Sequence, residues 1–385
     1  MTDDTNALFN MDDSAFRAHV RDWIERNYPA EVIRFPSRRL HWHEVKPWFD
    51  RLSQKGWIAP GWPLEHGGMG LSGSKQLIMI EELERFGAAR VNDQGLIMLG
   101  PLLIRYGTDE QKALFLPRIL SGEHVWAQAY SEPNAGSDLA ALRLEAKDMG
   151  DYWLLNGQKT WVTLGGDANW IFLLARTDNS GKKQQGISFL LTPADAPGIT
   201  VRPIVNLDMG EEFSEMFFDD VQVPKELIVG EVHKGWTYAK DLLGFERIAI
   251  GSPKASANAI GRLERMTDLL GKRDDPTLRA ALIQHHLDLE DLKALYAAIS
   301  LSVKRGEPLG PEVTILKIAQ TELFQRITDT MIDLGAEHTA LTEPMGEGGL
   351  HPSGQFLLAR PATIFGGSSE ILRNIIARNV LGLPA

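Results

Sequence analysis

The amino-acid sequence predicts an α+β fold with an N-terminal helical domain, a middle antiparallel β-barrel or sandwich, and a C-terminal helical bundle. Three observations lead to this prediction. Apolar residues recur at helical spacing up to residue 122, short apolar runs punctuated by glycine and proline follow from 123 to 231, and a long helical apolar stripe lies between Leu316 and Leu334. The predicted domains are therefore residues 1–122, 123–231 and 232–385.

In the N-terminal part, Asp13 begins a predicted helix, and residues 74–86 repeat apolar side chains at close to helical spacing. Thr108 and Gln111 form a capping box, in which the threonine hydroxyl accepts from one helical N–H and the glutamine side chain reaches back. The helix that follows should end near Gly122.

One glycine-rich stretch in this part is a false signal. Gly68 to Gly73 match the G-x-G-x-x-G pattern of dinucleotide-binding loops, but that motif needs an apolar strand before it and a helix after it. Pro63, Glu65 and His66 stand where the strand would be. We therefore interpret the stretch as a loop and expect no nicotinamide-binding fold.

The middle part contains eight candidate strands, separated by turn residues. They are residues 124–130, 141–147, 152–156, 159–164, 169–175, 186–192, 199–206 and 215–222. Asn156-Gly157 stands between two β-rich runs, and both positions of a tight hairpin turn need positive φ. We therefore predict a hairpin with its turn at Asn156-Gly157.

The stretch from Trp126 to Thr163 also offers chemistry. Ser131 and Thr163 carry hydroxyls that donate and accept hydrogen bonds, and Trp161 has a large flat face, so together they would suit a flat heteroaromatic ring. The alternative is that Trp161 and Tyr130 are ordinary strand aromatics, which strands favour.

In the C-terminal part, a helical stripe after Pro311 predicts a long helix packed in a bundle. Its apolar members are Leu316, Ala319, Leu323, Phe324, Ile327, Met331 and Leu334.

The overall composition excludes several classes of function. A net charge of −11 and a pI of about 5.5 disfavour nucleic-acid binding, and the lack of cysteine excludes disulfides and a thiolate nucleophile. The pairs His41/His43 and His285/His286 lack the spacing of metal ligands, so no metal is expected. The acidic N-terminus lacks the features of a signal peptide, and no membrane-spanning apolar run occurs. We expect a cytoplasmic protein.

Several separated motifs together resemble the acyl-CoA dehydrogenase family. They are Gly107–Lys112 with Leu116-Pro117, Ser131–Asp138 (SEPNAGSD), Leu155–Thr163 (LNGQKTWVT) and Gly366–Asn374 (GGSSEILRN). The resemblance covers nearly the whole chain. It implies the same three-part fold with a C-terminal four-helix bundle, FAD as the cofactor, and α,β-desaturation of an acyl-CoA thioester.

The resemblance also implies roles for particular residues. The implied cofactor-binding residues are Gln128, Tyr130, Ser131, Trp161, Thr163, Gly367, Ser368 and Glu370, and the implied substrate-binding residues are Ser137 and Arg247.

The catalytic base is where the sequence departs from the commonest family pattern. Many members carry the glutamate just before the closing glycine-rich motif, where this chain has Gly366. A smaller set uses a glutamate directly before an arginine in the C-terminal domain, which matches Glu246-Arg247. The resemblance therefore implies that Glu246 takes the Cα proton while hydride passes from Cβ to flavin N5. The alternative is that Glu246 is a solvated helix carboxylate.

Two segments that serve the adenine end of FAD in the family are not kept here, at 270–277 and 331–338. With the closing motif, these departures resemble bacterial members that act on bulky or dicarboxylic acyl-CoA thioesters, including steroid side-chain and ring fragments, and that often form heterotetramers. The resemblance thus implies a homo- or heterotetramer with a second acyl-CoA dehydrogenase-like subunit, and an electron-transfer flavoprotein as acceptor. Two alternatives remain open: a non-catalytic or half-catalytic subunit, and a flavin-dependent oxidase or monooxygenase on the same fold.

Overall fold

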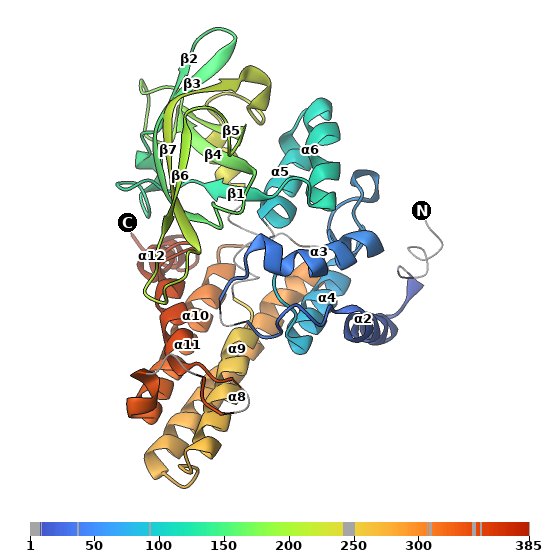
Figure 1. The fold of residues 1–385 in the computed structure, drawn as a ribbon, viewed down its shortest axis with the longest axis vertical. Coiled ribbons are helices and arrows are strands. Elements are labelled where there is room, and N and C mark those ends of the chain that lie inside the picture. Colours follow the sequence, from blue (N-terminus) through green and yellow to red (C-terminus); the bar gives the residue numbers. More distant parts are fainter. Residues whose placement is uncertain are drawn as a thin grey trace. The chain divides into compact units, whose positions relative to one another are not determined.

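The computed structural model describes residues 8, 10–36, 38–91, 94–241, 251–305, 307, 310–340, 344–346 and 349–384, apart from the side chains of residues 303 and 304. The chain divides into two compact units, Met1–Leu243 and Gly244–Ala385, called here the first and second unit (Figure 1). The first unit contains the predicted N-terminal helical domain and the predicted middle domain. The division of the chain at residues 122 and 231 stays a prediction.

The first unit begins with helices whose ends follow local sequence signals. They are α2 (Asp13–Asn27), α3 (Trp42–Lys55), η1 (Leu64–His66), α4 (Gly73–Phe86), η2 (Gln94–Leu99), α5 (Gly100–Tyr106) and α6 (Asp109–Ser121). The predicted capping box is confirmed, because the Thr108 hydroxyl accepts from Gln111 N at 3.2 Å and Gln111 Oε1 accepts from Thr108 N at 3.2 Å. Gly122 ends α6 with φ +74°. Residues 68–72 form a loop before α4, as predicted, and α4 begins at Gly73.

The middle of the chain forms a curled seven-stranded sheet in the order β1-β4-β2-β3-β7-β6, with β5 paired to β4. The strands are β1 (Trp126–Ala129), β2 (Glu145–Asp148), β3 (Tyr152–Thr163), β4 (Trp170–Arg176), β5 (Ile187–Pro193), β6 (Ile199–Ile204) and β7 (Phe213–Pro224). The short helix η3 (Leu139–Ala141) lies between β1 and β2 in the chain, and η4 (Lys225–Leu227) follows β7. The sheet is mixed, because β4 runs parallel to β1 and β2, whereas the sequence predicts antiparallel strands only.

The predicted hairpin at Asn156-Gly157 is wrong, because β3 runs without interruption from Tyr152 to Thr163. The turn lies earlier, at 149–151, where Gly150 has φ +91°. Gly157 instead lies at a bulge in the pairing of β3 with β7, with φ +145°, and the Asn156 side chain bonds to Asp220 on β7. A bulge and a tight turn both favour glycine, so the dipeptide alone does not distinguish them.

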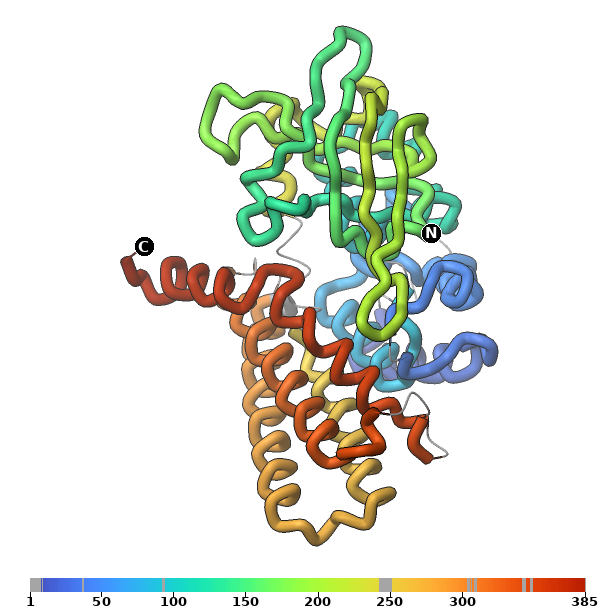
Figure 2. The backbone as a smooth tube through the Cα atoms, turned by 60° about the vertical axis from the view of Figure 1, so that its left-hand side comes forward, coloured from blue at the N-terminus to red at the C-terminus, as the bar shows by residue number. Residues whose placement is uncertain are grey.

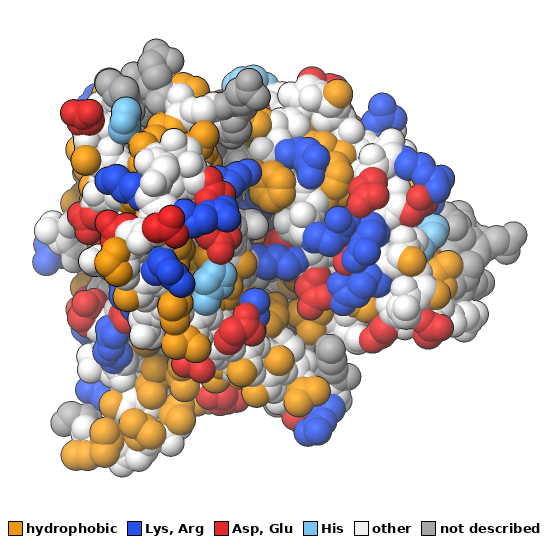
Figure 3. Space-filling model, turned by 90° about the horizontal axis from the view of Figure 1, so that it is seen from below, with side chains coloured by type: hydrophobic (Ala, Val, Ile, Leu, Met, Phe, Trp, Pro, Cys, Tyr) orange, Lys and Arg blue, Asp and Glu red, His pale blue; other side chains and the backbone are white. Residues whose placement is uncertain are grey.

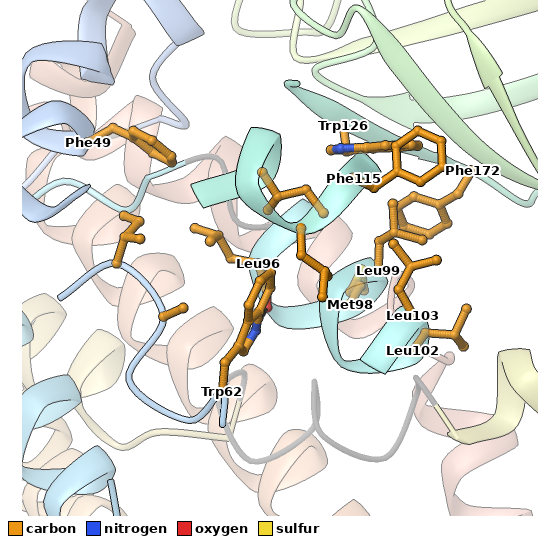
Figure 4. Packing of buried hydrophobic residues seen from close by; sticks show 14 of the residues in the cluster. Phe49, Trp62, Leu96, Met98, Leu99, Leu102, Leu103, Phe115, Trp126 and Phe172 are labelled. Atoms are coloured by element: carbon orange, nitrogen blue, oxygen red, sulfur yellow. Dashed lines mark hydrogen bonds between the residues drawn. The ribbon is translucent and has the colours of Figure 1, made fainter. Parts of the chain in front are cut away.

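The sheet separates two hydrophobic cores of the first unit. Side chains alternate across β4, so that Phe172 and Leu174 face the core under the N-terminal helices while Ile171 and Leu173 face the opposite core. Figure 4 shows the first of these cores, in which Trp126 and Phe172 lie beside Phe115, Leu99 and Leu103 of the helices. The helices and the sheet are therefore packed together as one body.

The second unit is a helical bundle built around α10. Its helices are α8 (Lys254–Leu269), α9 (Pro276–Lys304), α10 (Val313–Gly335), η5 (Ala336–Ala340), α11 (Pro352–Ala359), η6 (Arg360–Thr363) and α12 (Ser369–Asn379). In Figure 2, α8, α9 and α10 run side by side. The predicted stripe from Leu316 to Leu334 packs in the bundle core, which confirms that prediction.

The surface carries charges of both signs, which are intermixed on the face in Figure 3. Among the residues that the structure describes, no helix is long and apolar enough to cross a membrane.

A buried carboxylate clamps α2 to α4. The Glu82 side chain on α4 is 1% exposed and accepts hydrogen bonds from Arg17 and Arg21 of α2 and from Arg85 of α4. Burial by itself would raise the pKa of Glu82, but these arginine hydrogen bonds outweigh it and lower the pKa to about 2.

We expect this clamp to make stability sensitive to acid. Because the folded-state pKa of Glu82 lies below the ordinary value of 4.5, its contribution is present above pH 4.5 and is lost as the pH falls toward 2. Urea titrations of a Glu82→Gln variant should show about 3 kcal/mol less stability at pH 7 and a flatter loss below pH 4.5. Glu81→Gln, at a more exposed neighbouring residue, serves as the control and should change stability by less than about 1 kcal/mol. Equal effects of the two variants would contradict the prediction.

Candidate functional site

A buried ion pair joins the two motif segments of the middle domain. Lys159 on β3 is fully buried, and its Nζ lies 2.7 Å from Glu132 Oε1 and 3.1 Å from the Tyr130 carbonyl oxygen. Glu132 also accepts hydrogen bonds from the backbone N–H groups of Arg143 and Leu144. Burial lowers the pKa of Lys159 to about 8 although Glu132 attracts its charge. The pair therefore fixes the loop after β1 against β3.

The Lys159–Glu132 ion pair helps to position the candidate hydroxyl groups. Thr160 N donates to the Ser131 carbonyl at 2.9 Å, which holds Ser131 alongside β3. Ser131 and Thr163 are both half-buried, whereas Ser137 is exposed in the turn that follows β1. The structure thus brings Ser131 and the end of β3 together, as the sequence predicts.

Gln94 is a residue of this site that the sequence analysis does not identify. It is 8% exposed at the start of η2, its Oε1 accepts from Gln128 N, and its Nε2 donates to the Thr163 carbonyl at 3.4 Å. One side chain therefore bridges β1 and the end of β3. The helix η2 has π geometry, which is frequent at functional sites, but no local motif in the sequence marks Gln94.

Trp161 is held in an unusual conformation at the end of β3. It is 59% exposed and has φ +58°, in a stretch where the register between β3 and β7 shifts. Among the described residues, its ring contacts one other aromatic ring, that of Phe213. The two rings lie edge to face with 5.9 Å between their centroids. Positive φ is costly for a bulky side chain, and such strain collects at functional sites. Trp161 is therefore not an ordinary strand aromatic.

Tyr130 differs from Trp161 in this respect. Its side chain is buried, and its ring packs edge-on against Phe172 and Phe189 in the core below the sheet. The ordinary role of a strand aromatic describes this side chain well. A cofactor contact of Tyr130 stays a prediction.

The loop after β3 is anchored to a helix end. Asp167 accepts a hydrogen bond from Trp42 N at 2.8 Å, and its carboxylate lies 3.1 Å from Nδ1 of His41, the N-cap of α3. A carboxylate at a helix N-terminus is stabilised by the unpaired N–H groups there. The anchor restrains the chain just beyond Thr163.

In the second unit, the closing motif forms the entry to α12. Gly366 and Gly367 have φ +62° and +91°, conformations that glycine adopts without strain. Ser368 is the N-cap, accepting from Ile371 N at 3.4 Å, and Glu370 lies in the first turn. Hydrogen bonds from its own backbone N–H and from Ser368 lower the pKa of Glu370. A cofactor contact of Gly367, Ser368 and Glu370 stays a prediction.

Glu246 and Arg247 lie outside the described residues. The two departures from the family pattern lie at helix ends. Residues 270–277 span the connection between α8 and α9, and residues 331–338 span the end of α10. There Ala336 has φ +44° and ψ −116°, a conformation that favours glycine.

A cavity of about 800 Å³ lies elsewhere in the first unit. It is lined by residues of α6, η4 and the ends of β2 and β3, such as Phe115, Asp148, Trp153, Lys225 and His233. None of the described residues that line it is a predicted site residue, and Lys225 there pairs with Asp148. The end of β3 therefore stays the candidate site.

Comparisons with known proteins find the same family along nearly the whole chain. Sequence models of the N-terminal, middle and C-terminal domains of acyl-CoA dehydrogenases match residues 10–123, 127–221 and 233–381. The acyl-CoA dehydrogenase IpdE1 of Mycolicibacterium smegmatis is 38% identical over 390 residues, covering 96% of this chain and 97% of the relative. IpdE1 of Mycobacterium tuberculosis is 37% identical over 380 residues, with 96% and 97% covered.

Two solved structures share the fold. The steroid ACAD Tcur3481-Tcur3483 superposes with a TM-score of 0.86 at 29% identity, covering 97% of both chains. The ChsE4-ChsE5 complex from Mycobacterium tuberculosis gives a TM-score of 0.80 at 29% identity, covering 100% of this chain and 99% of the other. The predicted three-part fold class is thereby confirmed, and the chain belongs to the acyl-CoA dehydrogenase family of oxidoreductases.

Proposed function

We propose that the chain catalyses the FAD-dependent α,β-dehydrogenation of an acyl-CoA thioester. The observation that carries the proposal is Trp161, an exposed aromatic face held at positive φ at the end of a strand that a buried ion pair and Gln94 fix in place. A large flat face that the fold holds at a cost suits a planar ring system.

The residues near β1 fit such a cofactor. The Nε2 atom of Gln128 is buried and has no hydrogen-bond partner among the residues that the structure describes. A buried amide donor is costly unless a polar group meets it, and a flavin ring has carbonyl and nitrogen acceptors along its edge. In the proposal, Gln128, Tyr130, Ser131, Trp161 and Thr163 hold the ring.

In the same proposal, Gly367, Ser368 and Glu370 would contact the ribityl and phosphate groups of FAD. When bound, FAD supplies the acceptor, at N5, for the hydride that leaves Cβ. Ser137 and Arg247 would bind the CoA part of the substrate.

Glu246 acts in the proposal as the base that removes the Cα proton. A carboxylate serves best when it is held within hydrogen-bonding reach of that proton and is shielded from water, which raises its proton affinity. Gly366, at the usual family position of the base, has no side chain to take this role.

The visible absorption spectrum of the purified chain tests the proposal. We expect a flavin spectrum that bleaches when an acyl-CoA thioester is added without oxygen, with colour regained through an electron-transfer flavoprotein. A protein that binds no flavin, alone or with a partner subunit, would refute the proposal. Rapid return of colour in air would instead indicate an oxidase or monooxygenase.

Replacing Trp161 by glycine separates its role in binding from its role in folding. Because glycine adopts φ +58° freely and little packing is lost, we expect the Tm of Trp161→Gly without cofactor to stay close to the wild-type value. Its affinity for FAD should fall about fivefold or more, since aromatic contacts of this kind contribute about 1 kcal/mol or more.

The matched control is Trp153→Gly on the same strand, where the side chain is 4% exposed. This variant should lose several kcal/mol of stability, about 3–5 for a buried tryptophan. Unchanged FAD affinity in Trp161→Gly, measured by fluorescence titration, would remove Trp161 from the site.

A second candidate is a subunit that completes its FAD sites together with a different, related chain. Ala336 favours it, because its positive φ is a conformation that favours glycine and it lies within residues 331–338, one of the two segments that depart from the family's adenine-binding pattern. The similar solved structures described as ChsE4-ChsE5 and Tcur3481-Tcur3483 each name two chains. Because Tcur3481-Tcur3483 is described as a steroid ACAD, we propose a bulky, steroid-derived acyl group as the substrate.

Flavin content decides between the two candidates. About one FAD per chain in the protein purified alone would favour the homo-oligomer. A colourless chain that gains flavin and activity only when it is produced together with a second acyl-CoA dehydrogenase-like subunit would favour the heteromer.

A further inference from the structure

Lys317 is a buried lysine that has no part in the mechanism above. It lies on α10, is fully buried, and donates from Nζ to the carbonyl oxygen of Gly367 at 2.8 Å. The ring of Phe365 lies 6.0 Å from the same Nζ. The side chain thus reaches from the core of the bundle to the turn that precedes α12.

A lysine in this place is costly for folding. Burying an ammonium group is unfavourable unless hydrogen bonds compensate, and an apolar side chain of similar length would pack in the bundle without that cost. What the lysine supplies is a donor for a backbone carbonyl in the connection between η6 and α12.

The turn needs such a restraint. Gly366 and Gly367 both have positive φ, and glycine loses more conformational freedom on ordering than any other residue. The hydrogen bond from Lys317 fixes the second of these glycines directly before Ser368, the N-cap of α12.

We infer that Lys317 is a positioning residue for the cofactor, which holds the Gly366-Gly367 turn so that Gly367, Ser368 and Glu370 are in place to bind FAD. This inference rests on the proposed function. It assigns to Lys317 no contact with the cofactor itself.

Two variants on α10 form a matched test. Lys317→Met keeps the length of the side chain and removes the donor. Gln325→Met is the control, because Gln325 also donates from α10 to backbone carbonyls, those of Ala359 and Arg360 at 3.1 and 3.2 Å. Lys317→Gln keeps an N–H donor without the charge.

The readouts are hydrogen exchange of the amides of residues 366–372 without cofactor, and the Kd for FAD. We expect exchange at least about tenfold faster and FAD binding about tenfold weaker in Lys317→Met, as for the loss of one hydrogen bond to a charged donor. Gln325→Met should change neither, and Lys317→Gln should recover most of both. If Lys317→Met does not fold, Lys317→Leu, which also lacks a donor, replaces it as the test.

Unchanged exchange in Lys317→Met would overturn the inference, as would faster exchange with unchanged FAD affinity, or equal losses in Gln325→Met. Lys317→Gln behaving like Lys317→Met would also overturn it, since the bond to Gly367 would then not be the cause. A wild-type protein that binds no FAD in any assembly refutes the proposed function instead, and the exchange experiment still reports whether Lys317 orders the turn.

Discussion

Glu246→Gln should leave flavin bound and remove its reduction by substrate. Glutamine has nearly the size of glutamate but cannot take a proton, and a positioned general base typically contributes about a hundredfold to ten-thousandfold in rate. Single-turnover bleaching of the flavin band by acyl-CoA should slow by that factor. The flavin count per chain should equal that of the wild type.

Glu231→Gln is the matched control for this variant. Glu231 is an exposed glutamate shortly before the same segment, so the substitution makes the same change of charge without touching the proposed base. It should keep the wild-type rate. A Glu246→Gln protein with full activity would exclude Glu246 as the base, and a loss of flavin along with activity would point to a structural role.

Lys159→Met should produce a loss of stability as large as that of Trp153→Gly. It removes the charge that faces Glu132 and leaves this carboxylate buried with the N–H groups of Arg143 and Leu144 as its remaining donors. Breaking a buried pair by removing one partner costs about 3–5 kcal/mol. Because the pair holds Ser131 against β3, FAD affinity should fall together with the free energy of unfolding, both measured at pH 7.

The Lys183–Asp138 pair provides the comparison. Its separation is also 2.7 Å, but both side chains are more than half exposed, so Lys183→Met should cost less than about 1 kcal/mol. The double variant Glu132→Gln with Lys159→Met should recover part of the loss, because no unpaired charge remains. Equal losses in Lys159→Met and Lys183→Met would show that burial adds nothing to the pair.

Local sequence signals predicted much of this structure, because the interactions behind them join residues that are close in sequence. Thr108 and Gln111 sit three residues apart and satisfy each other's backbone groups, so the start of α6 needs no distant contact. The stripe from Leu316 to Leu334 likewise follows from the period of a single helix. The candidate residues Ser131, Trp161 and Thr163 came from their side-chain chemistry and from the resemblance of two motifs, which the fold brings side by side.

The Asn156-Gly157 prediction failed because its signal has two structural causes. Positive φ at glycine is required in a tight turn and also in a bulge, and only the pairing of β3 with β7 shows that the bulge is formed. The parallel pairing of β4 with β1 depends in the same way on partners that lie 44 residues apart in sequence.

The sequence by itself determined the family, the three-part order of helices, sheet and helices, and the motif residues, because period and motif spacing are properties of short segments. Only the tertiary structure decided that Trp161 is exposed and strained while Tyr130 is buried, that Lys159 is paired with Glu132 inside the protein, and that Gln94 bridges β1 and the end of β3 while Lys317 bonds to Gly367. These contacts join residues 27 to 69 positions apart, and no local pattern encodes which polar side chain will be left inside when distant elements pack.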